Sequence, residues 1–283
     1  MTMSLDKFHS DAERYVPKSP LWQNLRSTFI DIGRGLSRYD LWIYLGWREI
    51  RKHYSRSVLG PFWLTLSMGV LVGTLGVLYA EIFKMDISSY LPFLAVGFIM
   101  WGLIGGAITS SCTVFSIAAN SIRQIRLPLS VYMLQFVWMQ FITFAHNFVI
   151  YIIVAILFGI VPNAYSLLEI PAIFLVALNI LFCAMLLGPL SARFRDIPMI
   201  IGSLVQIAFF VTPILWSAGQ MPKRAHFLGL NPFYHFMEIV RQPLLGQVAT
   251  WNNWIISIAI TAVFGVIATL FFSHCRGRIA YWV

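Results

Sequence analysis

Charged residues are scarce in this chain. Asp, Glu, Lys and Arg together make up 11% of its 283 residues, whereas a soluble domain usually carries about 25%. Hydrophobic residues make up 59%, and the mean hydropathy is +0.76. So much apolar surface cannot all be hidden in one soluble core of this length, so the composition predicts that lipid surrounds much of the protein.

Cysteine is also rare, and sequence motifs of catalysis are missing. The three cysteines, Cys112, Cys183 and Cys275, lie far apart, each in or beside an apolar run. This pattern suggests neither a disulfide framework nor a metal site. No P-loop, no HExxH motif and no paired acids placed for catalysis are found. We therefore expect no catalytic residues and no cofactor in this chain, and any uphill work would need energy from a partner.

Six stretches free of Asp, Glu, Lys and Arg are long enough to cross a bilayer, which takes roughly 20 residues. They are continuously apolar rather than alternating, which predicts helices and not strands. The first 56 residues are polar, basic and aromatic, so no signal peptide is expected before the first stretch. The six stretches lie between Arg56 and Glu81, Asp86 and Arg123, Arg126 and Glu169, Glu169 and Arg193, Asp196 and Lys223, and Arg241 and Arg276.

The basic residues indicate the orientation. With the N-terminus in the cytoplasm, the inner segments hold 16 of the 20 Lys and Arg residues, and the outer segments hold only Lys84, Lys223, Arg224 and Arg241. An excess of Lys and Arg marks the cytoplasmic side of a membrane protein. The distribution therefore predicts that both termini are cytoplasmic. It also explains the net charge of +9 without a nucleic-acid partner.

His146 is the one side chain inside the apolar runs that titrates near neutral pH. Ion-coupled transporters usually hold carboxylates or bases within the membrane, so a secondary transporter is disfavoured. His146 is interpreted as a hydrogen-bonded packing residue, with a proton relay as the alternative. An integral-membrane transferase acting on lipid-linked sugars would need a cluster of carboxylates or histidines at one membrane face, and the sequence shows none.

Residues 36–58 are predicted to form an amphipathic helix on the membrane surface. Aromatic and aliphatic residues recur at helical spacing on one stripe, and basic residues occupy other faces. The simplest interpretation is an interfacial anchor in contact with membrane lipid. The alternative is that the basic residues recognise an anionic headgroup or diphosphate at the entrance of a transport path; these residues are Arg48, Arg51, Lys52 and Arg56.

Four segments together carry a resemblance to a known family. They read GWREIRKHYSRSVLGPFW (46–63), NSIRQIRLPLSVYML (120–134), ARFRDIPMIIGSLVQIAFFVTPILW (192–216) and LNPFYHFMEIVRQPLLG (230–246). In this order they resemble type-2 permeases of ATP-binding-cassette exporters. Within that superfamily they are most similar to O-antigen and capsular polysaccharide exporters, and teichoic-acid exporters are similar too.

The resemblance implies a homodimeric permease of the bacterial inner membrane with two copies of a separate ATPase subunit. ATP and Mg would bind to that partner, in agreement with the missing P-loop. The cargo would be a lipid-linked polysaccharide, O-antigen or capsule, moved from cytoplasm to periplasm. The alternative is a type-2 permease for teichoic acid, a lipid or a drug. The glycan, its lipid anchor and the need for a terminal cap stay open.

The family also implies roles for individual residues. A short cytoplasmic loop would dock on the ATPase through Arg123, Gln124, Arg126 and Pro128. The first and fifth spans line the pore in the family, which makes their aromatic residues the candidates for stacking on a glycan: Trp63, Tyr79, Phe209, Phe210 and Trp216. Most aromatic residues in such a chain pack in the core or face lipid, and this remains the alternative for each of the five.

The segment before the last span resembles an extracytoplasmic gate. Two short helices, separated by a break at Gly229 to Pro232, would dip into the outer leaflet above the pore. The gate residues would be Pro232, Phe233, Glu238 and Arg241. Glu238 and Arg241 are three residues apart on a predicted helix, which favours a salt bridge between them.

These observations predict an all-α integral membrane protein with six transmembrane helices, an amphipathic helix before them and two re-entrant helices before the last span. We expect a cytoplasmic segment at 1–35 and the amphipathic helix at 36–58. The transmembrane domain would cover 59–275, with the gate at about 217–250, and a cytoplasmic tail would follow at 276–283.

Overall fold

A computed structural model describes every residue except 1–19, 56, 58–59, 61, 126 and 218–227. Its regular elements are all helices, and the described residues include no strand. This confirms the expected all-helical class.

Each of the six charge-free stretches contains one long apolar helix. Five are long and apolar enough to cross a membrane, and the sixth, α10, has 15 residues. At 1.5 Å per residue α10 is about 22 Å long, short of the ~30 Å hydrocarbon core of a bilayer. By length and composition, five of the six are therefore candidate membrane spans among the described residues, and the sixth crossing stays a prediction. The six helices are α4 (Phe62–Phe83), α5 (Ile87–Ser111), α8 (Leu129–Leu157), α9 (Glu169–Arg193), α10 (Ile197–Val211) and α13 (Trp251–Cys275).

The early end of α10 has a local cause. Pro213 follows Thr212, and a residue before proline is pushed out of the helical region into an extended conformation. Thr212 accordingly has φ −84° and ψ 137°. The chain continues through Trp216 as irregular backbone. The predicted fifth span is therefore a short helix followed by a non-helical segment, residues 212–216.

Helix α5 lies at the centre of the bundle. Two thirds of its most apolar window is buried (67%), against 17% for α4. Helices α4, α8, α9, α10 and α12 all pack against α5. Helices α4 and α10 therefore keep most of their apolar surface exposed, and α10 has no buried residue at all.

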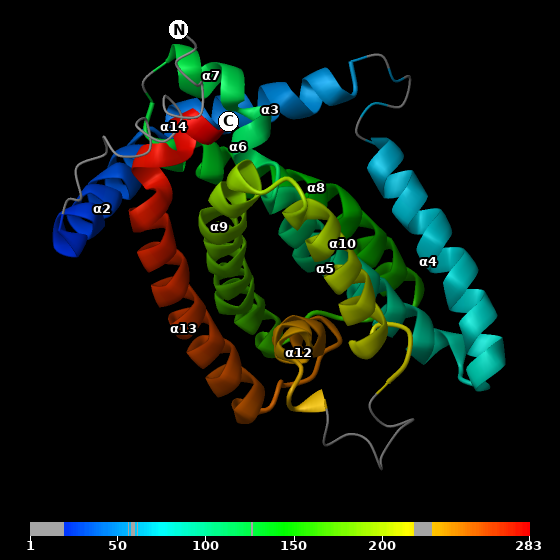
Figure 1. Ribbon diagram of the computed structural model, residues 1–283. Coiled ribbons are helices and arrows are strands. Elements are labelled where there is room, and N and C mark those ends of the chain that lie inside the picture. Colours follow the sequence, from blue (N-terminus) through cyan, green and yellow to red (C-terminus); the bar gives the residue numbers. More distant parts are fainter. Residues whose placement is uncertain (1–19, 56, 58–59, 61, 126, 218–227) are drawn as a thin grey trace, which may run out of the picture.

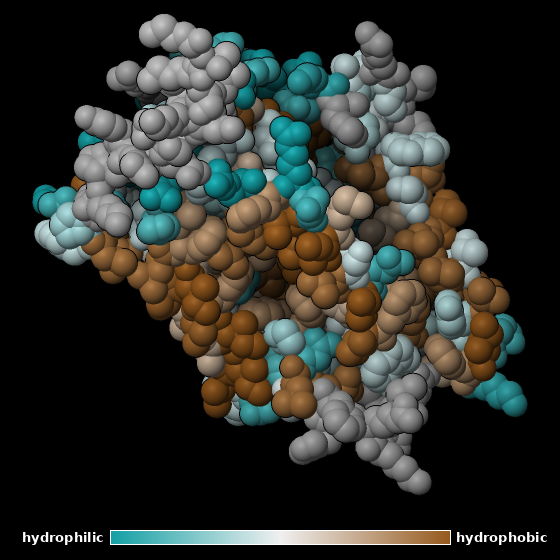
Figure 2. Space-filling view, viewed as in Figure 1, coloured by the Kyte–Doolittle hydropathy of each residue, from teal (hydrophilic) through white to brown (hydrophobic). Residues whose placement is uncertain are grey.

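One end of the bundle carries most of the basic side chains, and we call it the basic end. It holds α2 (Leu21–Ser37), α3 (Tyr39–His53), α7 (Ala119–Gln124) and α14 (Ile279–Trp282), which cluster together with the C-terminus in Figure 1. Short helices α6 (Val114–Ile117) and η4 (Arg276–Arg278) also belong to this end. Figure 2 shows hydrophilic residues at this end and hydrophobic ones over the helices beyond it.

The surface helix expected at 36–58 is divided differently in the structure. The chain leaves helical geometry at Arg38 (φ −99°, ψ 46°), so α3 begins at Tyr39 and ends at His53. Before this break lies α2, a second amphipathic helix that we did not assign from the sequence. It buries Thr28, Asp31 and Gly35 on one face and exposes apolar side chains such as Trp22 on the other.

Gly35 fixes how closely α2 approaches α8. A Cβ atom at this position would lie 2.2 Å from the hydroxyl oxygen of Ser130. No larger residue fits without moving the two helices apart. This close approach brings the neighbouring Asp31 within hydrogen-bonding distance of the start of α8.

At the opposite end, α12 (Pro232–Leu244) lies crosswise to the bundle and is seen nearly end-on in Figure 1. The short helix η1 (Ala164–Leu168) packs beside it. Of the two helices expected in this region, α12 is the second. The first was placed at His226–Leu230, and residues 226–227 lie outside the described part of the chain. Whether either helix re-enters the membrane stays a prediction.

Candidate transport path and coupling surface

Two of the five candidate channel aromatics lie on α4. Trp63 is 54% exposed near the basic end of the helix. Tyr79, 16 residues later, is half-buried and stacks on Phe83 with ring centroids 5.6 Å apart. Along a helix this separation amounts to about 24 Å. It also turns the second residue about 160° around the helix from the first, so Trp63 lies on the exposed face and Tyr79 packs toward the core.

The other three candidates lie on α10 and just beyond it. Phe210 is 63% exposed. Phe209 is half-buried, because its ring packs against Phe98 and Trp101 with centroid distances of 5.9 and 5.8 Å. Trp216 follows the end of the helix and is also half-buried. The structure thus separates two neighbours: Phe210 faces outward, and Phe209 is a packing residue.

Helix α12 is attached to the irregular segment after α10. Asn231 caps α12 by accepting a hydrogen bond from the amide of Phe233 (3.0 Å), and its own amide donates to the hydroxyl oxygen of Thr212 (3.0 Å). Tyr90 of α5 donates to the carbonyl of Leu215 (2.6 Å). Pro232 occupies the first turn of α12, where no backbone N–H is needed. Segment 212–216 is therefore hydrogen-bonded to the start of α12 through Asn231 and to α5 through Tyr90.

A buried ion pair lies inside α12, as the spacing predicted. The guanidinium of Arg241 lies 3.2 Å from a carboxylate oxygen of Glu238, and Arg241 is 1% exposed. Gln242 donates to the other carboxylate oxygen (2.6 Å). Burial lowers the pKa of Arg241, and the Glu238 carboxylate opposes this. Two further nitrogens of Arg241 lack a hydrogen-bond partner among the described residues.

Other contacts fix both ends of α12. The hydroxyl of Tyr151 in α8 donates to the carbonyl of Leu244 (2.5 Å), and the amide of Asn163 donates to the carbonyl of Gly246 (2.9 Å). The buried ring of His235 lies between the side chain of Asn253 (2.9 Å) and the carbonyl of Gly229 (3.0 Å). Helix α12 is therefore hydrogen-bonded to both α8 and α13.

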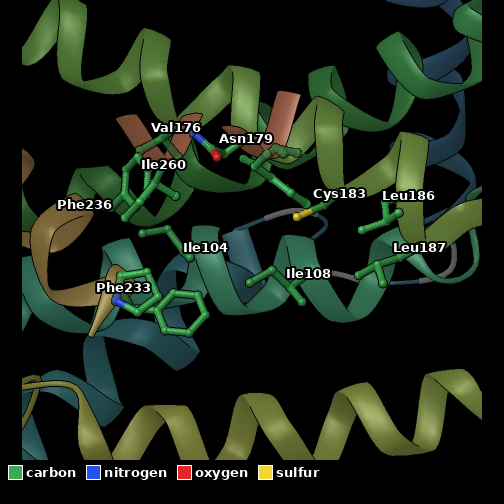
Figure 3. A pocket seen from close by; sticks show the side chains of 13 residues that line it. Ile104, Ile108, Val176, Asn179, Cys183, Leu186, Leu187, Phe233, Phe236 and Ile260 are labelled. Carbon is green, nitrogen blue, oxygen red and sulfur yellow. The ribbon is translucent and has the colours of Figure 1, made fainter. Parts of the chain in front are cut away.

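An apolar cavity of about 350 Å³ lies beneath α12, between α5, α9 and α13. Figure 3 shows side chains of α9 facing those of α5 across it, with Phe233 and Phe236 at one end. The amide nitrogen of Asn179 is already engaged by Thr261 and the carbonyl of Leu175, both at 2.8 Å. Phe233 thus belongs to the wall of this cavity and packs on Trp101 at 5.6 Å.

The predicted ATPase-docking residues lie at the basic end. Arg123 and Gln124 are exposed on α7, and Pro128 is the N-terminal cap residue of α8. Arg123 donates to the backbone oxygen of Val283 through Nε (2.9 Å) and through Nη2. Arg126 lies outside the described residues.

Asp31, also at this end, was not indicated by any sequence pattern, yet it makes several long-range contacts. Its carboxylate is buried and accepts from the amides of Leu129 (3.3 Å) and Ser130 (2.9 Å), the first turn of α8. It also pairs with Arg276 at 3.0 Å. Asp31 thereby joins α2, α8 and the end of α13. An isolated Asp on a helix carries no sequence signal for such long-range contacts.

The four basic residues proposed to bind a headgroup belong to α3 and the chain after it. Arg48, Arg51 and Lys52 are exposed, and Lys52 lies 3.6 Å from Glu49. Arg56 lies outside the described residues. An exposed row of cations at the surface of an apolar bundle can meet phosphate groups of lipid.

Metal and redox chemistry find no support in the described chain. No group of three or more His, Cys, Asp and Glu residues there is placed to hold a metal ion. The three cysteines are free and buried.

Comparison with known proteins agrees with this arrangement. The family model described as "ABC-2 type transporter" matches residues 40–245. The chain is 21% identical over 216 residues to an O-antigen export system permease protein RfbA of Klebsiella pneumoniae, covering 76% of this chain and 80% of the relative. It is 24% identical over 213 residues to a protein of the same name from Myxococcus xanthus, covering 74% and 82%. The region matched by the family model includes α4, α5, α8, α9, α10 and all of α12.

Proposed function

This chain belongs to the ABC-2 type transporter family, and we propose that it is the permease subunit of an ATP-driven exporter of lipid-linked polysaccharide. The cargo would be O-antigen or capsule, moved from the cytoplasm to the periplasm across the inner membrane. The observation that carries the cargo class is the similarity, over about three quarters of the chain, to relatives named as O-antigen export permeases.

The position of the basic end supports the proposed orientation of the protein in the membrane. Described cations at this end include those of α2, α3, α7 and the turn between α9 and α10, whereas the opposite end has Lys84 and the buried Arg241. Because Lys and Arg concentrate on the cytoplasmic side, we place the basic end in the cytoplasm, with both termini. Polymer would then enter near the exposed cations of α3 and leave beside α12.

Two exposed apolar faces support a second copy of this chain. Helix α4 exposes Val70 (61%) and Val77 (54%), and α10 exposes Met199 (76%) and Ile207 (61%). Both helices lie on the buried α5. In a homodimer the faces of α4 and α10 would surround a pore, with Trp63, Phe210 and Trp216 along its wall. Flat aromatic faces and few charges let a polymer slide without being trapped.

Energy would come from a separate ATP-binding-cassette subunit, in two copies, that binds ATP and Mg. The sequence has no nucleotide-binding motif, and family membership supports such a partner. It would dock on α7 and the adjoining loop, where Arg123 and Gln124 are exposed and Pro128 starts α8. The alternative cargo is teichoic acid, another lipid or a drug, carried by the same machinery.

Gene deletion followed by complementation tests the proposal. The deletion strain should lose surface polysaccharide and accumulate polymer inside the cell, and the wild-type gene should restore export. Purified permease should hydrolyse no ATP alone. Normal surface polysaccharide in the deletion strain would disprove this cargo, and drug sensitivity or altered lipid exposure in the same strain would then favour the alternative.

A further inference from the structure

The last residues of the chain connect three separate parts of the basic end. The C-terminal segment, residues 276–283, follows α13 as η4 and α14. Its backbone oxygen at Val283 accepts from Arg123 of α7. The ring of Trp282 lies 5.8 Å from the guanidinium carbon of Arg193, the last residue of α9. Arg276 pairs with Asp31 of α2 at 3.0 Å.

The segment is itself firmly seated. Ile279 is fully buried (0% exposed) and belongs to the main hydrophobic core. It is therefore a fixed point from which Trp282 and Val283 reach their partners. Tyr281, on the same short helix, is 82% exposed and takes no part in these contacts.

Helix α7 depends on such a fixed point. It has six residues and none of them is buried, and an isolated helix of this length is not stable in water. Its contacts with the rest of the protein include α6, the partly buried Ile122 and the bonds of Arg123 to Val283. A force on α7 therefore passes into the C-terminal segment.

From there the contacts continue to the end of α9, and the chain then passes through a short turn into α10. Arg193 faces Trp282 and lies four residues before Ile197, where α10 begins. A chain of packed side chains can carry coupling only if both ends respond to the same displacement. Here α7 and the end of α9 share one neighbour, α14, and α10 begins after a short turn that follows α9.

We infer that the C-terminal segment makes α7 and the start of α10 move together when the partner ATPase hydrolyses ATP, with Trp282 as the positioning residue. The inference rests on the proposed function for its source of motion. It assigns the segment a role in addition to that of the docking residues on α7.

Hydrogen exchange tests the mechanical part without substrate or partner. In the isolated permease, Trp282→Ala should raise exchange at least fivefold at the amide of Ile125, which bonds to the carbonyl of Ser121. Tyr281→Ala should leave it unchanged, and Trp282→Phe should restore protection. Arg193→Gln, which keeps the ring, should also raise exchange. Equal exchange in Trp282→Ala and Tyr281→Ala would overturn the inference.

The complex tests the transmission. With the ATPase trapped by Mg·ATP and vanadate, wild-type permease should change its exchange at both α7 and the first turn of α10. Trp282→Ala should change it at α7 alone. In cells, that variant should export at least fivefold less polysaccharide per ATP hydrolysed, with the ATPase's KM for ATP unaltered.

The two proposals fail in different ways. If the deletion strain keeps its surface polysaccharide, the proposed function is wrong, but exchange in the isolated permease still decides whether Trp282 holds α7. If wild-type exports normally and Trp282→Ala matches Tyr281→Ala in polymer per ATP, the inference is wrong and the function stands.

Discussion

The guanidinium carbon of Arg241 lies 4.0 Å from the centroid of the Phe93 ring. This contact joins α12 to α5, and it occurs where the Glu238 carboxylate already pairs with the same guanidinium. Gly97, one turn along α5, leaves room for it, since a Cβ there would lie 2.9 Å from Nη2. Helix α12 is thus attached to the bundle by a buried cation, Arg241, which has both an ionic and an aromatic partner.

The Glu238–Arg241 pair should behave as one unit. Arg241→Met leaves a buried carboxylate without its cation, which typically costs about 3–5 kcal/mol. The double variant Glu238→Gln, Arg241→Met removes both charges and should recover most of that loss. Thermal unfolding in detergent, read as a double-mutant cycle, measures the coupling. Additive losses in the double variant would show that the two side chains act independently.

Asp31 should contribute far more to stability than the exposed Asp40. Asp31→Ala removes the cap of α8 and the partner of Arg276, and we expect a loss of roughly 2–3 kcal/mol. Asp40 lies 3.7 Å from Arg38 with both side chains more than half exposed, so Asp40→Ala should change stability by less than about 0.5 kcal/mol. Chemical unfolding of the two variants compares them directly. A similar effect of both substitutions would contradict the structural role of Asp31.

Substitution of Phe209 should lower stability, whereas substitution of Phe210 should lower transport. Phe209→Ala empties a packed site against Trp101 and should lower stability by roughly 2 kcal/mol, less than a fully buried phenylalanine. Phe210→Ala should leave the unfolding temperature within about 1 °C, since surface substitutions change stability little, and should reduce surface polysaccharide severalfold. Unfolding curves and surface-polymer blots are measured on the same strains. Normal export by Phe210→Ala would remove that residue from the transport path.

Export should not depend on a proton gradient. His146 lies on α8 with Nδ1 2.8 Å from the carbonyl of Ile142, the geometry of a side chain bonded within its own helix. His146→Gln should therefore export within twofold of wild type. A protonophore, added while cellular ATP is maintained, should have an equally small effect. Loss of export in both experiments would favour His146 as a proton relay.

The sequence predicted those structural features that depend on a single helix or a single apolar stretch. Continuous apolar stretches predicted the membrane helices, and the spacing of Glu238 and Arg241 predicted their pair. Contacts between distant parts of the chain were missed. Asp31 and Ser130 are 99 positions apart, and nothing local to either residue specifies the other. The length of α10 was missed because the charge-free stretch between Asp196 and Lys223 shows only that a span could fit, whereas Pro213 decides where the helix ends.

The boundaries of the amphipathic helices α2 and α3 were also hard to predict from the sequence. The pattern at 36–58 was recognised and α2 was not, although α2 is at least as amphipathic as α3. Its buried side is set by Gly35, whose importance appears only when Ser130 lies against it. Close approach of two helices is a property of the pair, so a single sequence does not display it.

The short length of α10 has a consequence for the surrounding lipid. A helix of about 22 Å beside neighbours long enough to cross the whole hydrocarbon layer creates a hydrophobic mismatch. The bilayer must become thinner locally, or the polar backbone of residues 212–216 must be shielded by protein or water. Reconstitution into lipids of increasing acyl-chain length should therefore slow transport progressively, so membrane thickness would act as a regulator of this exporter.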